Sequence, residues 1–344
     1  MTPPGSLTRR RALAGLAALG AAAVAPGCAR FGGEESGPAS VAGGGAEGGA
    51  DALRVQLAWT RGPQFTGTFV ADRDGAFIDE GFASVTLLDG GPGLDPHTTV
   101  LDGAALYGTT GAQHFAAAVA GGAPLVALGA VLRRSPYGVV VAGNAGAADD
   151  ISGARVGVPE PLVPLWRLAA GRAGLTGTES VLVDWSITAL RDGEVDALVG
   201  FLPTVARKVS AAELPVSALG FDVFATPLPD ELLVTSAETL ESTRPALVRA
   251  LRAEAAGWDS TLADPAGAVT TTVDVYAADL GLGDELVHAE LERITPLVAA
   301  DGSPLLTVPA DTLAAAGEVL TELGHPVPPA AWAVDVADEA ATDG

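Results

Sequence analysis

The sequence predicts an α/β protein of two lobes, each a mostly parallel sheet flanked by helices. Short runs of β-branched and aliphatic residues alternate with helical stretches, which is the pattern of parallel strands joined by crossover helices. The alternation starts again after Ser135-Pro136-Tyr137, so we expect the chain to enter a second lobe there. With 344 residues, 48% of them hydrophobic, the chain is long and apolar enough to fill two cores.

The first series of elements is regular enough to place each strand and helix. Runs rich in Val, Leu and aromatic residues are the expected strands, and they cover Leu53–Trp59, Ser84–Leu88, Ala104–Gly108 and Pro124–Leu132. The expected helices between them cover Phe69–Phe77, Thr98–Asp102 and Gln113–Ala120. Gly121-Gly122 ends the last of these helices, because glycine readily takes the left-handed conformation that follows a helix.

The second series repeats this rhythm and then leads back. Its expected strands and helices are Gly138–Val141, Arg155–Val158, Leu162–Ala173, Val181–Trp185, Ile187–Asp192 and Ala197–Phe201. Val223–Ala225 and Leu232–Val234 are interpreted as the return crossing, and beyond Glu238 the chain is mostly helical, with a fresh helix at Pro265. The expected boundaries are 52–136 plus 232–331 for the first lobe, 137–231 for the second, and 332–344 for an acidic tail that we expect to be disordered from Asp335 onward.

The N-terminal residues predict export. Thr8–Leu13 contains three arginines and leads into an apolar run, Ala12–Ala25, that is followed by small residues. A charged start, a short apolar run and a small-residue cleavage site are typical of a signal peptide, and this run is too short to span a bilayer of roughly 30 Å. Because paired arginines address the Tat translocon, residues 1–27 are interpreted as a Tat-type lipoprotein signal peptide.

Cys28 directly follows the small residues, in a motif that resembles a bacterial lipobox, and it is the one cysteine in the sequence. We expect it to carry the lipid that anchors the exported protein to the outer face of the cell membrane; plain secretion with an unmodified cysteine is the alternative. Residues 28–51, rich in Gly and Ala, are expected to form a flexible tether. No later stretch has the ~18 apolar residues of a membrane helix.

Composition excludes several classes of function. The 42 acidic and 19 basic residues give a net charge of −23, which repels phosphate backbones and argues against nucleic-acid binding. The four histidines have no metal-ligand spacing, so we expect neither a metal site nor a cofactor. Neither a G-x-S-x-G elbow nor a GxxxxGK[ST] phosphate loop occurs in the sequence. We expect a monomer with no catalytic residues.

Several short motifs occur in a fixed order between about Leu53 and Asp301. They are Leu57-Ala58-Trp59 with Gly67 eight positions later, Phe69–Ala71 through Gly75–Phe77 to Glu80–Phe82, Leu101–Gly108, Gly121–Ala127, Ser135–Tyr137, Asp192–Ala197 and Asp264–Ala268. In these motifs the sequence resembles the ABC-transporter substrate-binding lipoproteins of the family that binds thiamine-pyrimidine precursors, sulfonates and nitrate. The resemblance implies a two-lobed, type II periplasmic-binding-protein fold that closes over one small molecule and presents it to an ABC permease with its ATPase.

Ligands of open α/β sheets sit beyond the carboxyl ends of the strands, so the loops there supply the candidate ligand-binding residues. In sequence order they are Trp59, Arg61, Gln64, Phe65, Gly90, Gly91, Thr109, Thr110, Gln113, Ser135, Tyr137, Glu160, Asp184, Trp185 and Phe201. Trp59 and Trp185 favour a planar ligand held by stacking. Thr110 is placed to cap the next helix, whose free N–H groups suit a ligand oxygen. For Trp166, packing of its helix onto the sheet is favoured over contact with the ligand.

The sequence departs from the pyrimidine-precursor binders where the substrate is chosen. Gly62 and Phe65 stand where those proteins carry asparagine and histidine, and Phe201–Thr204 lacks their Asn-Glu-Pro triplet, whose glutamate would read a ligand amine. Arg61 could instead pair with a sulfonate or carboxylate. The expected ligand is therefore a planar heterocycle, such as a pyrimidine or another vitamin precursor, or a sulfonate.

Three functions remain open at this point. A solute-binding protein of an ABC importer is favoured, and a ligand-sensing lipoprotein without a transport role would have the same fold. An extracellular enzyme using Glu160 and Asp184 as general acid and base is the third. The pyrimidine-synthase branch of the family is excluded, because it needs a cofactor lysine and a cysteine-rich motif, whereas Lys208 follows a helix of the second lobe and Cys28 precedes the fold.

Overall fold

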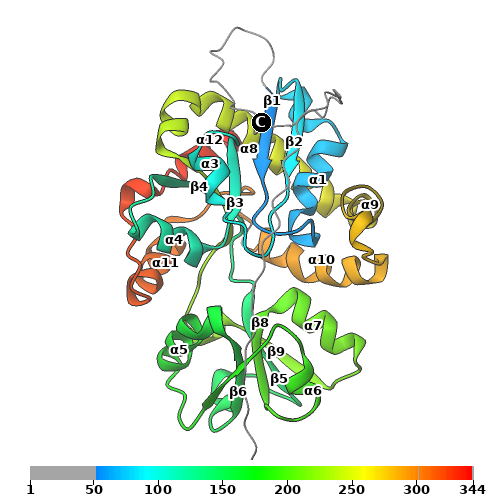
Figure 1. Ribbon diagram of the computed structural model, residues 1–344, viewed down its shortest axis with the longest axis vertical. Coiled ribbons are helices and arrows are strands. Elements are labelled where there is room, and N and C mark those ends of the chain that lie inside the picture. The colour runs from blue at the N-terminus through cyan, green and yellow to red at the C-terminus, as the bar shows by residue number, and fades with distance from the viewer. Residues whose placement is uncertain (1–51, 301, 343–344) are drawn as a thin grey trace, which may run out of the picture. The chain divides into compact units, whose positions relative to one another are not determined.

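The computed structural model describes residues 52–300 and 302–342 (Figure 1). The expected signal peptide, Cys28 and the tether lie outside the described residues. All of the described residues belong to one compact unit. Within it, two sheets each occupy their own end of the ribbon diagram in Figure 1.

The first sheet has the strand order β2-β1-β3-β10-β4. Its strands are β1 (Ala52–Gln56), β2 (Ser84–Leu88), β3 (Tyr107–Thr110), β4 (Leu125–Leu132) and β10 (Asp230–Ser236). β1 pairs in parallel with β2 and β3, whereas β10 runs antiparallel to both β3 and β4. The sheet is thus parallel except for the one strand that returns from the second lobe.

The second sheet repeats this plan with the order β7-β6-β8-β5-β9. Its strands are β5 (Tyr137–Ala142), β6 (Arg155–Pro159), β7 (Glu179–Val183), β8 (Ala197–Phe201) and β9 (Val216–Gly220). β6 pairs in parallel with β7 and β8, and β5 runs antiparallel to β8 and β9. The prediction of mostly parallel sheets is confirmed, and in each sheet the odd strand lies next to a crossing between the lobes.

Helices cover the faces of both sheets (Figure 1). They are α1 (Thr66–Arg73), α2 (Ala76–Asp79), α3 (His97–Leu101), α4 (Ala112–Ala120), α5 (Val163–Arg172), α6 (Thr188–Arg191), α7 (Leu202–Ala211), α8 (Ala237–Ala263), α9 (Pro265–Thr271), α10 (Asp284–Val298), α11 (Ala310–Glu322) and α12 (Asp335–Thr342). The expected helix over Phe69–Phe77 is divided into α1 and α2, because Gly75 adopts a left-handed backbone with φ 78°. Pro265 begins α9 as expected, with the Asp264 side chain accepting a bond from the Gly267 N–H.

Helix α1 packs closely on helix α8 over the first sheet. Gly67 of α1 faces the Trp258 ring of α8, and a Cβ added at Gly67 would overlap that ring. Gly257 of α8 in turn faces the Gly67 carbonyl, and it has no room for a Cβ either. The glycine at position 67 therefore has a packing reason, since only glycine at this crossing lets the two helices approach.

Two segments differ from the sequence-based expectation. The strand β9 was not expected, and it is followed by a 3-10 turn at Phe221–Phe224 that ends in a left-handed Ala225 within the expected return crossing. The acidic tail is not disordered from Asp335, because α12 buries Val336 and its neighbours in the first core. Arg244 also pairs with Asp335 and Glu339 of α12.

Helix α11 follows the first-lobe segment in sequence but packs into the second core. Its buried residues Ala316, Val319 and Leu320 belong to one apolar cluster with Trp166 and Phe224. Arg172 of α5 also pairs with Glu322 at the end of α11, with Nη2 and Oε1 2.7 Å apart. The C-terminal segment thus supports both sheets.

Candidate functional site

The carboxyl-end edge of the first sheet is where the candidate site forms. Because β10 is antiparallel, its first residues lie beside the last residues of β3, and Leu232 pairs with Thr110. On the other side Asp230 pairs with Leu132, the last residue of β4. The chain leaves for the second lobe immediately after Leu132 and returns immediately before Asp230. This edge therefore brings strand ends and both crossings together.

Two carboxylates that the sequence analysis missed occupy this edge. Asp230 is 6% exposed and Glu231 is 8% exposed. Asp230 accepts hydrogen bonds from the Glu231 N–H at 2.8 Å and from the Ala112 N–H at the start of α4. Burial raises the pKa of Asp230 to about 7. Burial, together with the charge of Asp230, raises the pKa of Glu231 to about 8.

Glu231 has two unusual features, a buried oxygen without a partner and a left-handed backbone. The Thr109 hydroxyl donates a hydrogen bond to its carboxylate, but its Oε2 is buried and has no hydrogen-bond partner. Its backbone has φ +46°, a left-handed conformation that costs a residue with a Cβ about 1–2 kcal/mol. The signal in the sequence was a pair of adjacent acidic residues directly before the apolar run Leu232–Val234.

Thr109 and Thr110 are both buried at the end of β3. Thr109 Oγ1 accepts a hydrogen bond from the Ala58 N–H at 2.9 Å, so it links the loop after β1 to Glu231. Thr110 Oγ1 lies 2.9 Å from His97 Nε2. The residue that precedes α4 is Gly111, and α4 has no side-chain cap. The expectation that Thr110 caps this helix was wrong, because its hydroxyl turns to His97 instead.

The loop after β1 holds Arg61 in a network of its own. Arg61 Nε lies 2.8 Å from Asp89 Oδ1, and Arg61 Nη1 donates to the Tyr276 carbonyl at 2.9 Å. A second carboxylate, Asp279, lies 3.6 Å away. The charge of Arg61 is therefore already compensated, which weakens the expectation that it pairs with an anionic ligand. Trp59 in the same loop is 49% exposed.

Several other candidates from this region have structural roles. Phe65 is buried and packs with Leu57 and Phe69, so the expectation that it faces the ligand is not supported. Gly90 approaches the backbone of residues 57–59 so closely that an added Cβ would overlap the Leu57 carbonyl. Of the remaining candidates in this lobe, Gly91 is buried, whereas Gln64 and Gln113 are half-buried.

Tyr137 and Phe201 form an aromatic pair at the start of the second sheet. They are paired across β5 and β8, with ring centroids 5.7 Å apart at 80°. Burial raises the pKa of Tyr137, and the charges of Asp230 and Glu231 raise it further, so its phenol lies near both carboxylates. Ser135 Oγ accepts a hydrogen bond from the Tyr137 N–H at 3.2 Å. Three predicted candidates thus gather around the two carboxylates.

The other second-lobe candidates lie on the surface. Glu160 is exposed after β6, and Asp184 is exposed after β7, where it accepts a hydrogen bond from the Ser186 N–H at 2.8 Å. Trp185 is 53% exposed, and its carbonyl accepts a bond from Lys208 Nζ at 3.2 Å. Trp166 is buried and bonds to Ser180. The packing interpretation of Trp166 agrees with this position.

A contact between helices α7 and α10 joins the segments of the two lobes. Arg207 Nε of α7 lies 2.5 Å from Glu290 Oε1 of α10, and Thr204 Oγ1 donates to Glu290 Oε2 at 3.2 Å. Glu290 is 4% exposed, so its side of the pair is largely shielded from water. Figure 1 shows α7 at the end of the second lobe that faces α10.

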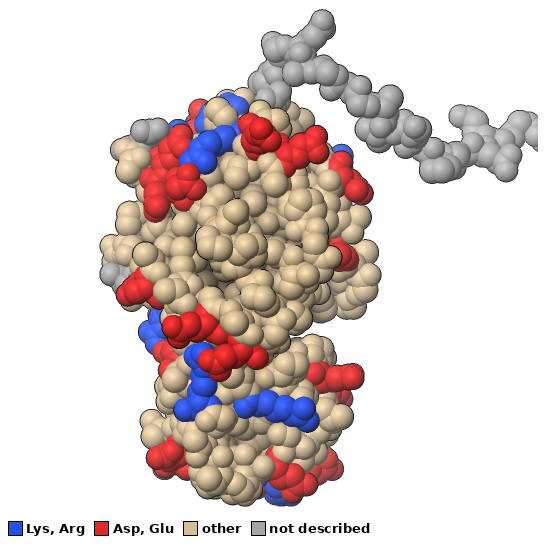
Figure 2. All heavy atoms as spheres, turned by 90° about the vertical axis from the view of Figure 1, so that its left-hand side faces the viewer, with Lys and Arg blue, Asp and Glu red and all other residues tan. Residues whose placement is uncertain are grey.

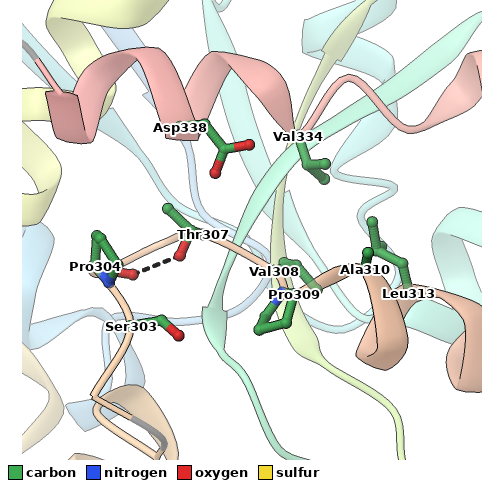
Figure 3. A pocket seen from close by; sticks show the side chains of 9 residues that line it. All are labelled: Ser303, Pro304, Thr307, Val308, Pro309, Ala310, Leu313, Val334 and Asp338. Atoms are coloured by element: carbon green, nitrogen blue, oxygen red, sulfur yellow. Dashed lines mark hydrogen bonds between the residues drawn. The ribbon is translucent and has the colours of Figure 1, made fainter.

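Neither of two cavities in the structure is lined by Asp230 or Glu231. One, of about 350 Å³, is lined by residues between Ser303 and Leu313 together with Val334 and Asp338 (Figure 3). The other, of about 250 Å³, is lined by Arg133, Arg134, Ser135, Asp222, Pro227, Asp311, Thr312 and Ala315. The second cavity lies at the crossings, where Arg134 pairs with Asp222.

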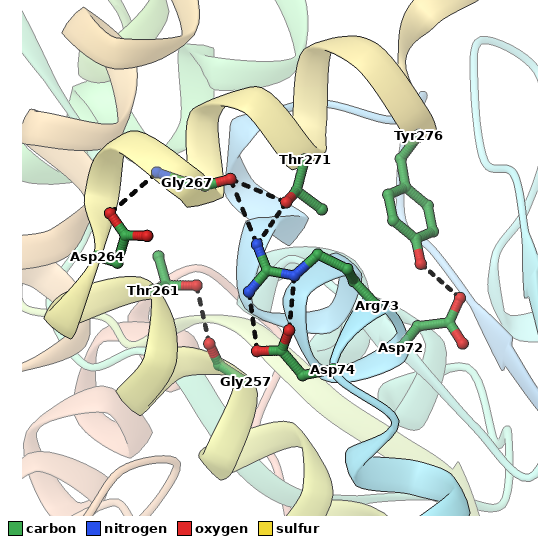
Figure 4. A network of polar contacts seen from close by, with 9 residues as sticks. All are labelled: Asp72, Arg73, Asp74, Gly257, Thr261, Asp264, Gly267, Thr271 and Tyr276. Atoms are coloured by element: carbon green, nitrogen blue, oxygen red, sulfur yellow. Dashed lines mark hydrogen bonds and ion pairs between the residues drawn. The ribbon is translucent and has the colours of Figure 1, made fainter.

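A further polar network fastens helix α1 to the C-terminal helices (Figure 4). Arg73 pairs with Asp74 at 2.6 Å and donates to Thr271 of α9 at 2.6 Å, and the Tyr276 hydroxyl donates to Asp72 at 2.6 Å. Because these contacts all lie within the first lobe, this network serves the scaffold. Elsewhere acidic side chains gather in groups on the face shown in Figure 2, with fewer basic ones among them.

Within residues 52–300 and 302–342, no group of three His, Cys, Asp or Glu side chains is arranged to hold a metal ion. In the same part of the chain, no helix combines the length and apolar character that crossing a bilayer requires.

Comparisons with known proteins identify the fold. A family model described as NMT1/THI5 like matches residues 62–268. No curated protein sequence matches the chain. Among solved structures, the periplasmic aliphatic sulphonate binding protein SsuA from Escherichia coli is 16% identical with a TM-score of 0.63, over 79% of this chain and 91% of that one.

Two further structures are similar to the same extent. A putative sulfonate ABC transporter protein, the periplasmic sulfonate-binding protein SsuA from Methylobacillus flagellatus, is 13% identical with a TM-score of 0.62, over 86% of this chain and 94% of that one. The desulfurization enzyme DSZB is 15% identical with a TM-score of 0.54, over 84% and 98%. At these identities the likeness concerns the fold, and it confirms the prediction of a two-lobed periplasmic-binding-protein fold.

Proposed function

The chain belongs to the NMT1/THI5-like family, and from that membership we propose that it is the extracytoplasmic solute-binding component of an ABC importer. It captures a small molecule between its lobes and delivers it to a membrane permease with its ATPase. The observation that carries the proposal is the edge of the first sheet, where Thr109, Glu231 and Tyr137 converge between the two crossings. The names of the SsuA structures support a solute-binding role.

Ligand binding is coupled to lobe closure in this proposal. A ligand that contacts both lobes stabilises the closed arrangement over the open one, and the gain equals its difference in affinity for the two. The hinge lies in the crossings, near Arg134–Gly138 and Phe224–Leu232, where the left-handed Ala225 and Glu231 interrupt regular structure. The contact of Arg207 with Glu290 joins the two lobes on one side of the proposed ligand site.

Binding rather than catalysis is the proposed activity. Most of the similar structures cited above are named as binding proteins, although DSZB is named as an enzyme. Glu160 and Asp184, the carboxylates considered for acid–base work, are exposed, and hydrogen bonds from Ser186 lower the pKa of Asp184. A carboxyl held ionised in this way is a poor general acid. Export through the Tat pathway and anchoring at Cys28 complete the proposal, and they rest on the N-terminal sequence.

The proposal is tested by calorimetric titration of the full chain carrying Cys28→Ser, which removes the proposed lipid attachment site. The titrants are planar heterocycles, vitamins, sulfonates and inorganic anions. A single saturable site for one chemical class, with the negative heat-capacity change that accompanies burial, supports a solute-binding function. The absence of saturable binding across all of these classes contradicts it.

A further inference from the structure

We propose that Glu231, supported by Asp230, forms a subsite for a positively charged nitrogen of the ligand. The ligand class is then an amine, an amidine or a heterocycle with a protonated ring nitrogen, rather than a sulfonate. The inference rests on the proposed solute-binding function, and it names the chemistry which that site selects. Three independent features of the described residues support it.

The first feature is a buried oxygen without a partner. Glu231 Oε2 accepts no hydrogen bond, although the side chain is more than nine-tenths buried. Leaving a buried acceptor unpaired is unfavourable, and it is more so for a carboxylate, so native proteins rarely do it without a reason. A donor that arrives with the ligand supplies such a reason.

The second feature is that both carboxyl groups have only neutral hydrogen-bond partners among the described residues. The groups that bond to the two carboxylates are the N–H groups of Glu231 and Ala112 and the hydroxyl of Thr109, all of them neutral. Neither carboxylate forms an ion pair with a basic side chain in the part of the chain that the structure describes. Two adjacent buried carboxylates attract a cation, and each raises the cost of ionising the other. An entering ammonium or amidinium relieves that cost.

The third feature is position. Glu231 bonds to Thr109 in the first sheet, and its charge acts on Tyr137 in the second, so the carboxylate lies where the two sheets meet. Tyr137 and Phe201 place aromatic rings beside it, and aromatic rings also attract cations. The left-handed backbone of Glu231 adds a strain of the kind that clusters at ligand sites. Because Oε2 is buried, the ligand enters with the lobes apart.

The same features disfavour an anionic ligand. A sulfonate placed at this edge would meet Asp230 and Glu231, and Arg61, the basic candidate from the loop after β1, is already paired with Asp89. The subsite therefore distinguishes this chain from the similar structures that are named as sulfonate-binding proteins.

The test uses three matched sets of compounds, built on benzamidine as the planar cation, benzamide as the neutral isostere and benzenesulfonate as the anion, each extended with substituted analogues. Binding is measured by calorimetry on the full Cys28→Ser chain. We expect saturable binding within the cationic set and at least tenfold weaker binding after Glu231→Gln. Glu194→Gln, an exposed carboxylate in a turn of the second lobe, is the matched control and should leave that affinity unchanged.

The possible outcomes separate this inference from the proposed function. Binding of sulfonates alone, unchanged by Glu231→Gln, overturns the cation subsite but keeps the solute-binding function. The absence of saturable binding in all three sets, and for the vitamins and inorganic anions tested above, overturns both the cation subsite and the solute-binding function. Should Glu231→Gln fail to fold, Asp230→Asn serves as the second variant and is expected to weaken cation binding as well. Affinity for benzamidinium should also fall as pH drops from 9 to 5, because Asp230 and Glu231 take up protons over this range and lose their negative charge, whereas Tyr137 stays neutral throughout.

Discussion

Replacing Glu231 by Gln should stabilise the ligand-free protein at high pH and leave it nearly unchanged at low pH. The folded-state pKa of Glu231 is raised from 4.5 to about 8, so the folded state binds its proton more tightly than the unfolded chain does. Stability from this group is fully present below pH 4.5 and is lost as pH rises through about 8. Gln cannot ionise, so the variant does not suffer this loss.

The size of the effect follows from the two pKa values. Each unit corresponds to 1.36 kcal/mol, so raising a carboxyl pKa from 4.5 to about 8 corresponds to at most about 5 kcal/mol of unfolding free energy. Asp230 shares this repulsion, so the measured difference will be smaller. Even about 1.5 kcal/mol would raise Tm by about 2 °C in a chain of 344 residues.

The assay is thermal unfolding of the wild type and Glu231→Gln at pH 5 and pH 9. Burial lowers the pKa of His97 and raises that of Glu254, and both effects cancel in the comparison because both proteins contain these residues. We expect similar Tm values at pH 5 and a higher Tm for the variant at pH 9. A variant that is less stable at pH 9, or a difference independent of pH, would refute the reasoning and give Glu231 an ordinary structural role.

Three further predictions follow from other contacts. Gly67→Ala should destabilise the chain by about 1–3 kcal/mol, because its Cβ overlaps Trp258, whereas Gly146→Ala, in open space, should not; urea unfolding compares them. Glu290→Gln should remove the ion pair with Arg207 and so weaken lobe closure by about 1–2 kcal/mol. Ligand affinity should then fall roughly tenfold. Unchanged affinity would contradict the role of this contact. Cys28→Ser should release the protein into the medium, as measured by fractionation, and retention at the membrane would refute lipid anchoring.

Much of the fold was predictable because strands of buried sheets carry their signal locally. Both series of strands fell close to their expected ranges, since each is a short apolar run between turn residues. β9 was missed because Val216–Gly220 contains Ser and Ala and is short. The helix at Asp335 was missed because acidic composition outweighed the apolar residues Val336, Ala337 and Ala340, which fall on one side of a helical turn.

The site was only partly predictable because strand direction depends on the whole sheet. The rule that ligands lie beyond carboxyl strand ends led to Thr109 and Phe201, and the position of Tyr137 at the crossing between the lobes made it a candidate. It could not lead to Asp230 and Glu231, because they begin their strand, and only the antiparallel pairing of β10 places them at the same edge. The partners of a charged side chain cannot be predicted from the sequence either when they come from distant loops, as Asp89 and Tyr276 do for Arg61.

Solution scattering tests the central claim, that a ligand held between the lobes closes them. The full Cys28→Ser chain is measured alone and with a saturating concentration of the tightest-binding compound from the three charge-matched sets. The account predicts a smaller radius of gyration with the compound than without it, and no such decrease in the presence of a matched compound that does not bind. Identical scattering at proven saturation would contradict closure, and with it the mechanism by which this protein is proposed to capture its ligand.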